Sequence, residues 1–220
     1  KIASAGTQNP LLVRAIASMR KPVLVATGGI GIEQIRRVVD ALSDCPVVLM
    51  HCVSSYPAKP EKMNIRRVTA LKLSFPECVI GFSDHEHGLI TSLMATVLGA
   101  KVFEKHITMD HTAKGTDHVF SQEFGGFSQY IKNLSRAHGA LTIYDQPMEE
   151  EMKPLYKMGY AIYPARDLYK GLVVSPMDFV IKSPMEGLPG WAYDELIGRR
   201  TSRDLKKEQP LDWSDFEGEF

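Results

Sequence analysis

Short apolar runs rich in β-branched residues alternate with longer stretches of helical periodicity, and this rhythm constrains the possible folds most. The runs are VLVAT (23–27), VVLMHC (47–52), VIGFS (79–83) and KVFEKHI (101–107). Their first residues lie 22 to 32 positions apart, a spacing typical of successive βα units in a parallel sheet. The pattern predicts an α/β fold, either a Rossmann-like sheet or a (β/α)8 barrel. No GxGxxG motif opens a helix after these runs, which weakens the dinucleotide-binding alternative.

Helices are expected between the runs. Apolar residues recur there with i, i+3, i+4 spacing over 9–19, 32–42, 64–74 and 88–100. A further helix is expected over 122–141. The first residues, KIAS (1–4), are expected to be the end of an earlier strand.

The character of the chain changes after residue 141. The segment TIYDQPMEEEMKP carries an acidic run and two prolines, which predicts an exposed linker over 142–155. Beyond it, short apolar runs are interrupted by Gly and Pro, and YDELIGRR predicts one helical turn. The sequence therefore predicts a main domain over 1–141 and a small β-rich domain over 156–220.

Charge and apolar content limit the kind of partner. Lys plus Arg and Asp plus Glu both number 26, so the chain lacks the overall basic charge that is typical of nucleic-acid and membrane-surface binders. No apolar run approaches the length of about 20 residues that a membrane span requires. A small-molecule partner is expected, with no nucleic acid and no membrane.

The three cysteines, Cys45, Cys52 and Cys78, are odd in number and show no CxxC spacing. They therefore suggest neither a disulfide framework nor a zinc cluster, and a reducing, cytoplasmic location is expected. Strand alternation turns Cys52 away from the face of its neighbour His51. We expect Cys52 to be a small buried residue rather than a nucleophile.

Each apolar run becomes polar where it ends. The polar residues at these ends are Thr27, His51, Ser54, Ser83, His85, Glu104 and His106. In parallel α/β folds the ligand site lies at the carboxyl ends of the strands, because the βα loops converge there. The sequence therefore predicts one site built from several strand ends.

Side-chain alternation brings two histidines together within this site. Ser83 and His85 share one face of their strand, and Glu104 and His106 share one face of the next. On neighbouring strands the two imidazoles would lie about 5 Å apart, which suits two ligands of one metal ion. Mixed nitrogen and oxygen coordination favours Mn²⁺ or Mg²⁺ over a structural zinc.

Six motifs in this order resemble those of the N-acetylneuraminate (sialic acid) synthase family, which includes the legionaminic and pseudaminic acid synthases. They are KIAS, VATGG, LMHCVSSYP, GFSDHEHG, GAKVFEKHIT and KGTDH. ARDLYKG and YDELIGRR resemble the antifreeze-like (SAF) domain that follows the barrel in these enzymes. The resemblance implies a partial (β/α)8 TIM barrel holding strands four to eight, the fourth ending at KIAS. The first three strands are absent, so the chain is expected to be the C-terminal part of a synthase.

Members of this family condense phosphoenolpyruvate with the open-chain aldehyde of an N-acetylated hexosamine, such as ManNAc. The reaction forms a nine-carbon α-keto acid and releases phosphate. The resemblance also implies dependence on a divalent metal, Mn²⁺ or Mg²⁺, and a domain-swapped homodimer.

The resemblance carries over residue by residue to ten positions. The metal ligands are implied to be His85 and His106, and Glu104 is implied to handle the attacking water. The positions implied to contact the substrates are Lys1, Ser4, Thr27, Ser54, Tyr56, Ser83 and, on the sugar side, Asp117.

Two departures from the family pattern concern the substrates, and the second of them leaves the acceptor sugar open. Ala26 stands where the family has a serine, which removes a hydroxyl from the phosphate side. Ser183 stands where many bacterial members have an arginine, and a hydroxyl cannot replace a planar cationic donor without changing what is recognised. A non-catalytic oligomerisation or carbohydrate-binding module remains the alternative to a synthase.

Overall fold

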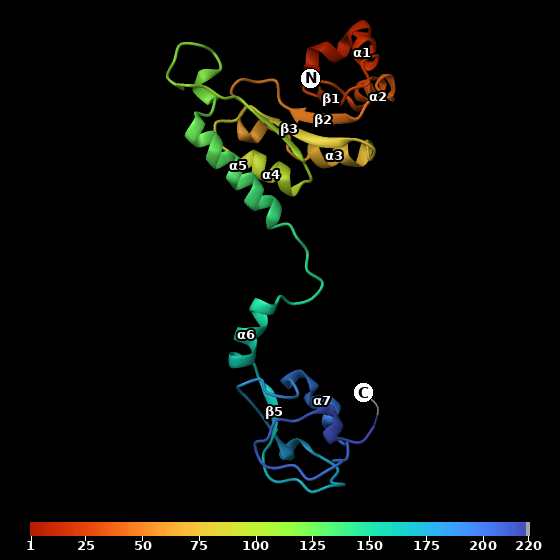
Figure 1. Ribbon diagram of the computed structural model, residues 1–220, viewed down its shortest axis with the longest axis vertical. Coiled ribbons are helices and arrows are strands. Elements are labelled where there is room, and N and C mark those ends of the chain that lie inside the picture. Colours follow the sequence, from red (N-terminus) through yellow and green to blue (C-terminus); the bar gives the residue numbers. More distant parts are fainter. Residues whose placement is uncertain (219–220) are drawn as a thin grey trace. The chain divides into compact units, whose positions relative to one another are not determined.

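The structure, a computed structural model, describes residues 1–218 and divides into two compact units after Thr142 (Figure 1). Each unit has its own hydrophobic core. The first unit spans Lys1–Thr142, and the second begins at Ile143.

Four parallel strands form a curled sheet in the first unit. In chain order, which is also their order in the sheet, they are β1 (Val23–Ala26), β2 (Val47–Cys52), β3 (Val79–Asp84) and β4 (Val102–Lys105). Ile2 adds a parallel bridge to Val25 outside β1, so the first residues run beside the sheet as the end of a strand would. The sheet is a half-barrel, which agrees with the partial barrel that the family resemblance implied; the βα rhythm alone left a Rossmann-like sheet open as well.

Five helices accompany this sheet, and α3, α4 and α5 lie along one side of it (Figure 1). They are α1 (Pro10–Ala17), α2 (Ile32–Ala41), α3 (Arg67–Ser74), α4 (Ile90–Val97) and α5 (Phe124–Gly139), each within a range where helical periodicity predicted one. The start of α1 has a local cause: the Asn9 side chain accepts hydrogen bonds from the N–H groups of Leu11 and Leu12, and Pro10 occupies the first turn.

Alternation divides the strand residues between two environments. His51 pairs in register with Phe82, which belongs to the core that the helices cover. Cys52 pairs with Ser83, and Ser83 pairs with Glu104, so these three share the opposite face of the sheet. At the carboxyl ends of the strands, this opposite face carries polar residues that the sequence analysis predicted for a site.

The second unit is built around two short antiparallel strands, β5 (Ala161–Pro164) and β6 (Phe179–Lys182). One helical turn, α7 (Tyr193–Leu196), lies where YDELIGRR predicted it. The core of this unit gathers buried residues from both strands and from the following loops, among them Ile162, Leu168, Leu205 and Leu211.

The predicted linker over 142–155 differs from the structure in its second half. Helix α6 (Glu149–Met158) begins inside it. The acidic run that suggested an exposed linker lies in the first turn of this helix, where carboxylates are favoured by the helix dipole. Glu151 also accepts a hydrogen bond from the Met148 backbone N–H at 3.0 Å, which caps the helix.

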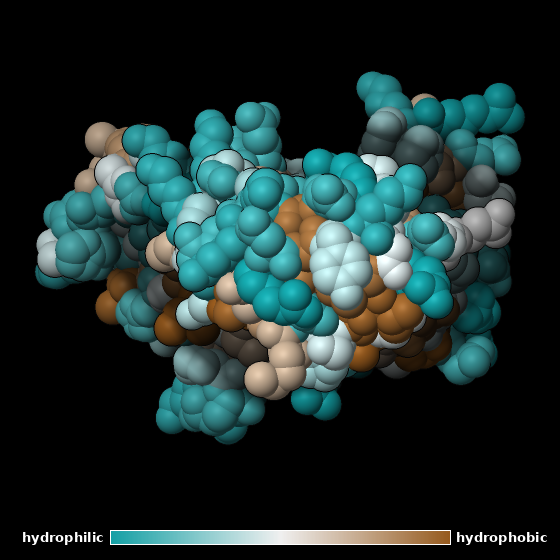
Figure 2. Space-filling view, turned by 90° about the horizontal axis from the view of Figure 1, so that it is seen from below, coloured by the Kyte–Doolittle hydropathy of each residue, from teal (hydrophilic) through white to brown (hydrophobic). Residues whose placement is uncertain are grey.

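The surface mixes apolar and polar residues, as on the face shown in Figure 2. Among the large apolar side chains that are exposed on the second unit are Met177 and Trp191. Within residues 1–218, no helix has both the length and the apolar composition required to cross a bilayer.

Candidate active site

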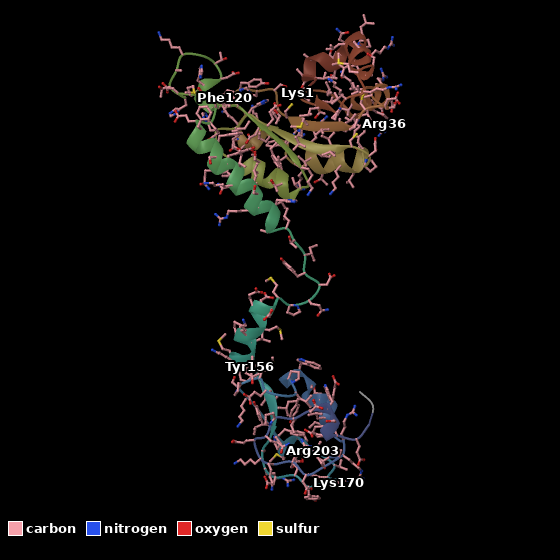
Figure 3. All side chains as sticks on the ribbon, viewed as in Figure 1. Lys1, Arg36, Phe120, Tyr156, Lys170 and Arg203 are labelled. Carbon is pink, nitrogen blue, oxygen red and sulfur yellow. The ribbon has the colours of Figure 1, made fainter. Side chains whose placement is uncertain are left out.

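A cavity of about 310 Å³ lies at the carboxyl ends of the strands. It brings together eight of the ten site residues that the resemblance implied, drawn from segments far apart in the sequence. Its lining consists of Lys1, Ala3, Ser4, Ala5, Ala26, Cys52, Ser54, Tyr56, Ser83, His85, Glu104 and His106. Figure 3 labels Lys1 at this edge of the first unit, together with Phe120, whose ring contacts that of His106.

Glu104 lies between two donors in this cavity. Its carboxylate accepts a hydrogen bond from the Ser83 hydroxyl at 2.8 Å and pairs with the Lys1 ammonium. Burial acts to raise the pKa of Glu104, but the hydrogen bonds from Lys1 and Ser83 outweigh it and lower this pKa below its usual value. Glu104 is therefore a carboxylate at neutral pH.

The His85 ring is held in one orientation. Its Nδ1 lies 2.8 Å from the carbonyl oxygen of Val53, which accepts a hydrogen bond from Nδ1–H. This tautomer leaves the lone pair on Nε2, which lies 3.4 Å from the Ser83 hydroxyl. Burial lowers the pKa of His85, so the ring is neutral at physiological pH and available as a nitrogen ligand.

The His106 ring meets the His85 ring edge to face, with the ring centroids 5.3 Å apart. Tyr56 lies over His85, 4.4 Å between centroids, and Phe120 lies 4.9 Å from His106. Two imidazoles on one cavity, with a carboxylate and a hydroxyl beside them, form a donor set that fits a divalent cation requiring nitrogen and oxygen ligands.

Two predicted site residues lie outside this cavity. The Thr27 hydroxyl donates to the carbonyl of Met50 at 3.1 Å, and Thr27 lines a neighbouring cavity instead. Asp117 lies in the loop after β4, with Oδ2 3.6 Å from His106 Nδ1 and about half of its side chain exposed. Asp117 is thus close to the imidazole pair, whereas Thr27 is turned away from it.

Cys52 is buried, as expected, and it also lies on the cavity. Its Sγ lies 3.6 Å from the Ser4 hydroxyl. Alternation turns Cys52 away from the face of His51, and His51 is the residue on the helix side. The register of β2 against β3, which pairs Cys52 with Ser83, places Cys52 on the cavity face.

Gly28 was not among the predicted site residues, but it lies beside the cavity lining. Its N–H donates to the Ser4 hydroxyl at 3.0 Å. A Cβ at this position would lie 2.5 Å from Ser54 Oγ and 2.9 Å from Cys52 Sγ, so a larger residue cannot fit without displacing the lining. The glycine thus permits the close approach of three hydroxyl or thiol groups.

A second group of potential metal ligands lies on the surface. Asp110, His111 and Glu123 are exposed, and their ligand atoms lie within 4.8 Å of one another. Across residues 1–218 this is the one place where three such ligand atoms meet in that way. Here the carboxylate of Glu123 already accepts a hydrogen bond from His111 Nδ1 at 2.7 Å.

Parallel strands whose carboxyl ends carry the polar residues of a cavity define the chain as part of an α/β-barrel protein of the enzyme type. Comparison with protein-family models makes this specific. The NeuB family matches residues 1–145 and the SAF domain matches residues 161–217. The chain therefore belongs to the NeuB family and carries a SAF domain.

Individual relatives agree with this assignment. The chain is 30% identical to the pseudaminic acid synthase of Campylobacter jejuni and 29% identical to the N,N'-diacetyllegionaminic acid synthase of Legionella pneumophila, in each case over 99% of its own length. It covers 64% and 63% of these two proteins, respectively. The crystal structure of N-acetylneuraminic acid synthetase from Leptospira borgpetersenii is similar over 70% of this chain and 54% of that chain, with 30% identity and a TM-score of 0.64.

Proposed function

We propose that this chain is part of a sialic-acid-type synthase that condenses phosphoenolpyruvate with the aldehyde of an N-acetylated hexosamine. The products are a nine-carbon α-keto acid and phosphate. The observation that carries the proposal is the convergence of Lys1, Glu104, His85 and His106, with their hydroxyl neighbours, on one cavity of a chain that belongs to the NeuB family. Because the relatives include both a pseudaminic acid synthase and an N,N'-diacetyllegionaminic acid synthase, the identity of the hexosamine stays open.

Phosphoenolpyruvate binds through the donors on one side of the cavity. The Lys1 ammonium and the hydroxyls of Ser4 and Ser54 supply a cation and hydrogen bonds for the phosphate and carboxylate groups. Because the Gly28 N–H already occupies the Ser4 hydroxyl oxygen as an acceptor, that hydroxyl is free to donate its proton to the substrate. These contacts fix the position of the enol carbon that attacks the aldehyde.

Glu104 acts on the carbon that becomes positively charged after this attack. An ionised carboxylate beside an oxocarbenium centre stabilises its charge and accepts the proton of the water that adds there. Ser83 holds the carboxylate by its 2.8 Å hydrogen bond. The phosphate then leaves as the resulting tetrahedral centre collapses to the ketone.

His85 and His106 hold a divalent cation, Mn²⁺ or Mg²⁺, in this proposal. When bound, the cation polarises the aldehyde oxygen as a Lewis acid. The hydrogen bond from His85 Nδ1–H to the Val53 carbonyl fixes the ring so that Nε2 is the ligand atom. Asp117, close to His106, is positioned to contact the sugar hydroxyls.

We further propose that the active protein has a closed (β/α)8 barrel, with this half-barrel supplying its fourth to eighth strands. It acts in the cytoplasm as a domain-swapped homodimer in which the SAF domain of each subunit covers the barrel of the other. The separate core of the second unit supports its independent folding, which such an exchange requires.

The test is an assay of the full-length protein with phosphoenolpyruvate, ManNAc and Mn²⁺. We expect release of inorganic phosphate that depends on the sugar, and loss of this release in His85→Ala. Related N-acetylated aldehyde sugars, tested in the same way, identify the acceptor. Phosphate release that His85→Ala leaves unchanged would contradict the metal-ligand role of His85.

A further inference from the structure

A second cavity, of about 380 Å³, adjoins the candidate active cavity. The two share Cys52 and Ser54 in their linings. The remaining lining residues are Thr27, Gly29, His51, Val53, Lys62, Asn64 and Arg67. This cavity lies between the ends of β1 and β2 and the start of α3, and no role described above uses it.

His51 lines this cavity and has a ring nitrogen that accepts no hydrogen bond. Its side chain is buried, with 1% of its surface exposed. Nε2 lies 2.8 Å from the Met63 carbonyl oxygen, so Nε2–H must donate to that carbonyl. Burial lowers the pKa of His51, so the ring is neutral and Nδ1 carries a lone pair. Nδ1 has no hydrogen-bond partner, and it requires a donor.

Arg67 brings an unused donor. One of its terminal nitrogens donates to the Ile30 carbonyl, but its Nε is buried and has no partner. Burial is the main cause that lowers the pKa of His51, and the positive charge of Arg67 lowers it further. Two lining residues of the cavity thus carry buried polar atoms without a partner, an acceptor on His51 and an N–H donor on Arg67.

The charge of the lining favours an anion. Lys62 and Arg67 both line the cavity, and no lining residue is acidic. Neither of these two cations forms an ion pair with any residue in the described range 1–218. Two unpaired positive charges around one cavity attract a ligand that carries negative charge.

We propose that this cavity binds inorganic phosphate, with a P–OH group donating to His51 Nδ1 and the phosphate oxygens accepting from Arg67 and Lys62. At neutral pH inorganic phosphate keeps at least one proton, so it offers a donor and acceptors together with negative charge. Sulfate and carboxylates offer acceptors only and leave Nδ1 unpaired. A single water could bridge the two orphan atoms, but it occupies about 30 Å³ and neutralises neither cation.

The position beside the candidate active cavity suggests what the site does. If the proposed function holds, phosphate is released on the other side of Cys52 and Ser54, and the second cavity receives it as it leaves. This role rests on the proposed function. The binding itself does not, so it is measured without turnover.

Isothermal titration calorimetry of the full chain with inorganic phosphate, and separately with sulfate at the same pH and ionic strength, tests the proposal. We expect phosphate to bind at least about tenfold more tightly than sulfate, although sulfate carries the higher charge, because only phosphate satisfies His51. Equal or tighter binding of sulfate overturns the assignment.

Two variants locate the binding. Lys62→Met is expected to weaken phosphate binding about tenfold or more, whereas the matched control Lys59→Met, an exposed lysine outside the cavity, leaves it unchanged. His51→Phe, checked for native circular dichroism, is expected to abolish the preference for phosphate over sulfate.

The candidate active cavity could also bind phosphate, through Ser4 and its neighbours. Ser4→Ala therefore serves as the third variant. Phosphate binding that survives Ser4→Ala and is lost in Lys62→Met supports the proposed site. Binding that is lost in Ser4→Ala and unchanged in Lys62→Met places the ion in the other cavity and overturns the proposal, while leaving the proposed synthase function intact.

Discussion

Asp84 and Lys105 form an ion pair, with Oδ2 3.1 Å from Nζ and both side chains completely buried. The Ser92 hydroxyl also donates to the Asp84 carboxylate, at 2.7 Å. The two charged residues end neighbouring strands, and each directly precedes one of the cavity histidines, His85 and His106. The pair therefore ties together the two strand ends from which the imidazoles project.

Asp84→Asn is expected to lower the free energy of unfolding by about 3–5 kcal/mol, because it leaves the buried Lys105 ammonium without its counter-charge. The matched control is Asp44→Asn, in the exposed pair that Asp44 forms with Arg20 at 3.8 Å. Its effect is expected to stay within about 0.5 kcal/mol. Urea unfolding followed by circular dichroism measures both. If both variants lost a similar amount of unfolding free energy, the buried ion pair would contribute no more to stability than the exposed one.

Glu104→Gln is expected to reduce kcat by about 10²–10⁴-fold, because an amide can neither accept the proton of water nor stabilise the positive centre. The hydrogen bond from Ser83 can be retained by the amide oxygen, so the fold should be preserved. Steady-state phosphate release by the full-length protein measures the effect, with the exposed Glu33→Gln as control. A kcat close to that of the unsubstituted protein would remove Glu104 from the mechanism.

Mn²⁺ is expected to raise the melting temperature of the protein through His85 and His106, because a ligand bound only by the folded state stabilises it. His85→Ala should abolish the increase. His111→Ala should not, since it disrupts the separate exposed group of Asp110, His111 and Glu123. The reverse result would assign the ion to that surface group.

Gly28→Ala is expected to raise KM for phosphoenolpyruvate, because its Cβ would lie only 2.5 Å from Ser54 Oγ and must displace the cavity lining. The control is Gly125→Ala in α5, where a Cβ would meet nothing within 4 Å. Steady-state kinetics of the full-length protein compare the two. Equal KM values would mean that the lining tolerates the added carbon.

The stability of the second unit is expected to fall at acid pH because of Asp178. Burial acts to raise the pKa of Asp178, but hydrogen bonds from Ser175 and the Arg166 guanidinium outweigh it and lower this pKa below the ordinary value of 3.8. The folded state then binds fewer protons than the unfolded state. The contribution to stability is complete above that ordinary value and is lost as pH falls through the lower, folded pKa.

Tryptophan fluorescence measures this effect selectively, because Trp191 and Trp213, the two tryptophans of the chain, both belong to the second unit. Asp178→Asn should weaken the acid dependence of unfolding, whereas the exposed Asp194→Asn should preserve it. Unfolding that becomes no easier between pH 5 and pH 3 would contradict the assignment.

The sequence by itself indicated parallel βα units and a small β-rich C-terminal part, and its family motifs narrowed the fold to a partial barrel. The 22 to 32 residue rhythm, the helical periodicity and the polar strand ends are local patterns. Local patterns can be recognised in the amino-acid sequence without knowledge of the tertiary structure. Alternation also indicated which side chains of β3 and β4 face together, because a period of two follows from strand geometry alone. The start of α6 inside the expected linker was missed, because an acidic run favours a solvated coil and a first helical turn alike.

Only the tertiary structure decided which strand faces meet across the sheet. Register between strands placed Cys52 with Ser83 on the cavity and sent His51 to the helix side, where its Nδ1 has no partner. In the structure Thr27 lines a neighbouring cavity. Lys1 pairs with Glu104, which lies 103 positions later in the chain. Such contacts depend on how strands pair and helices pack over long sequence separations, and no local pattern in the chain specifies them.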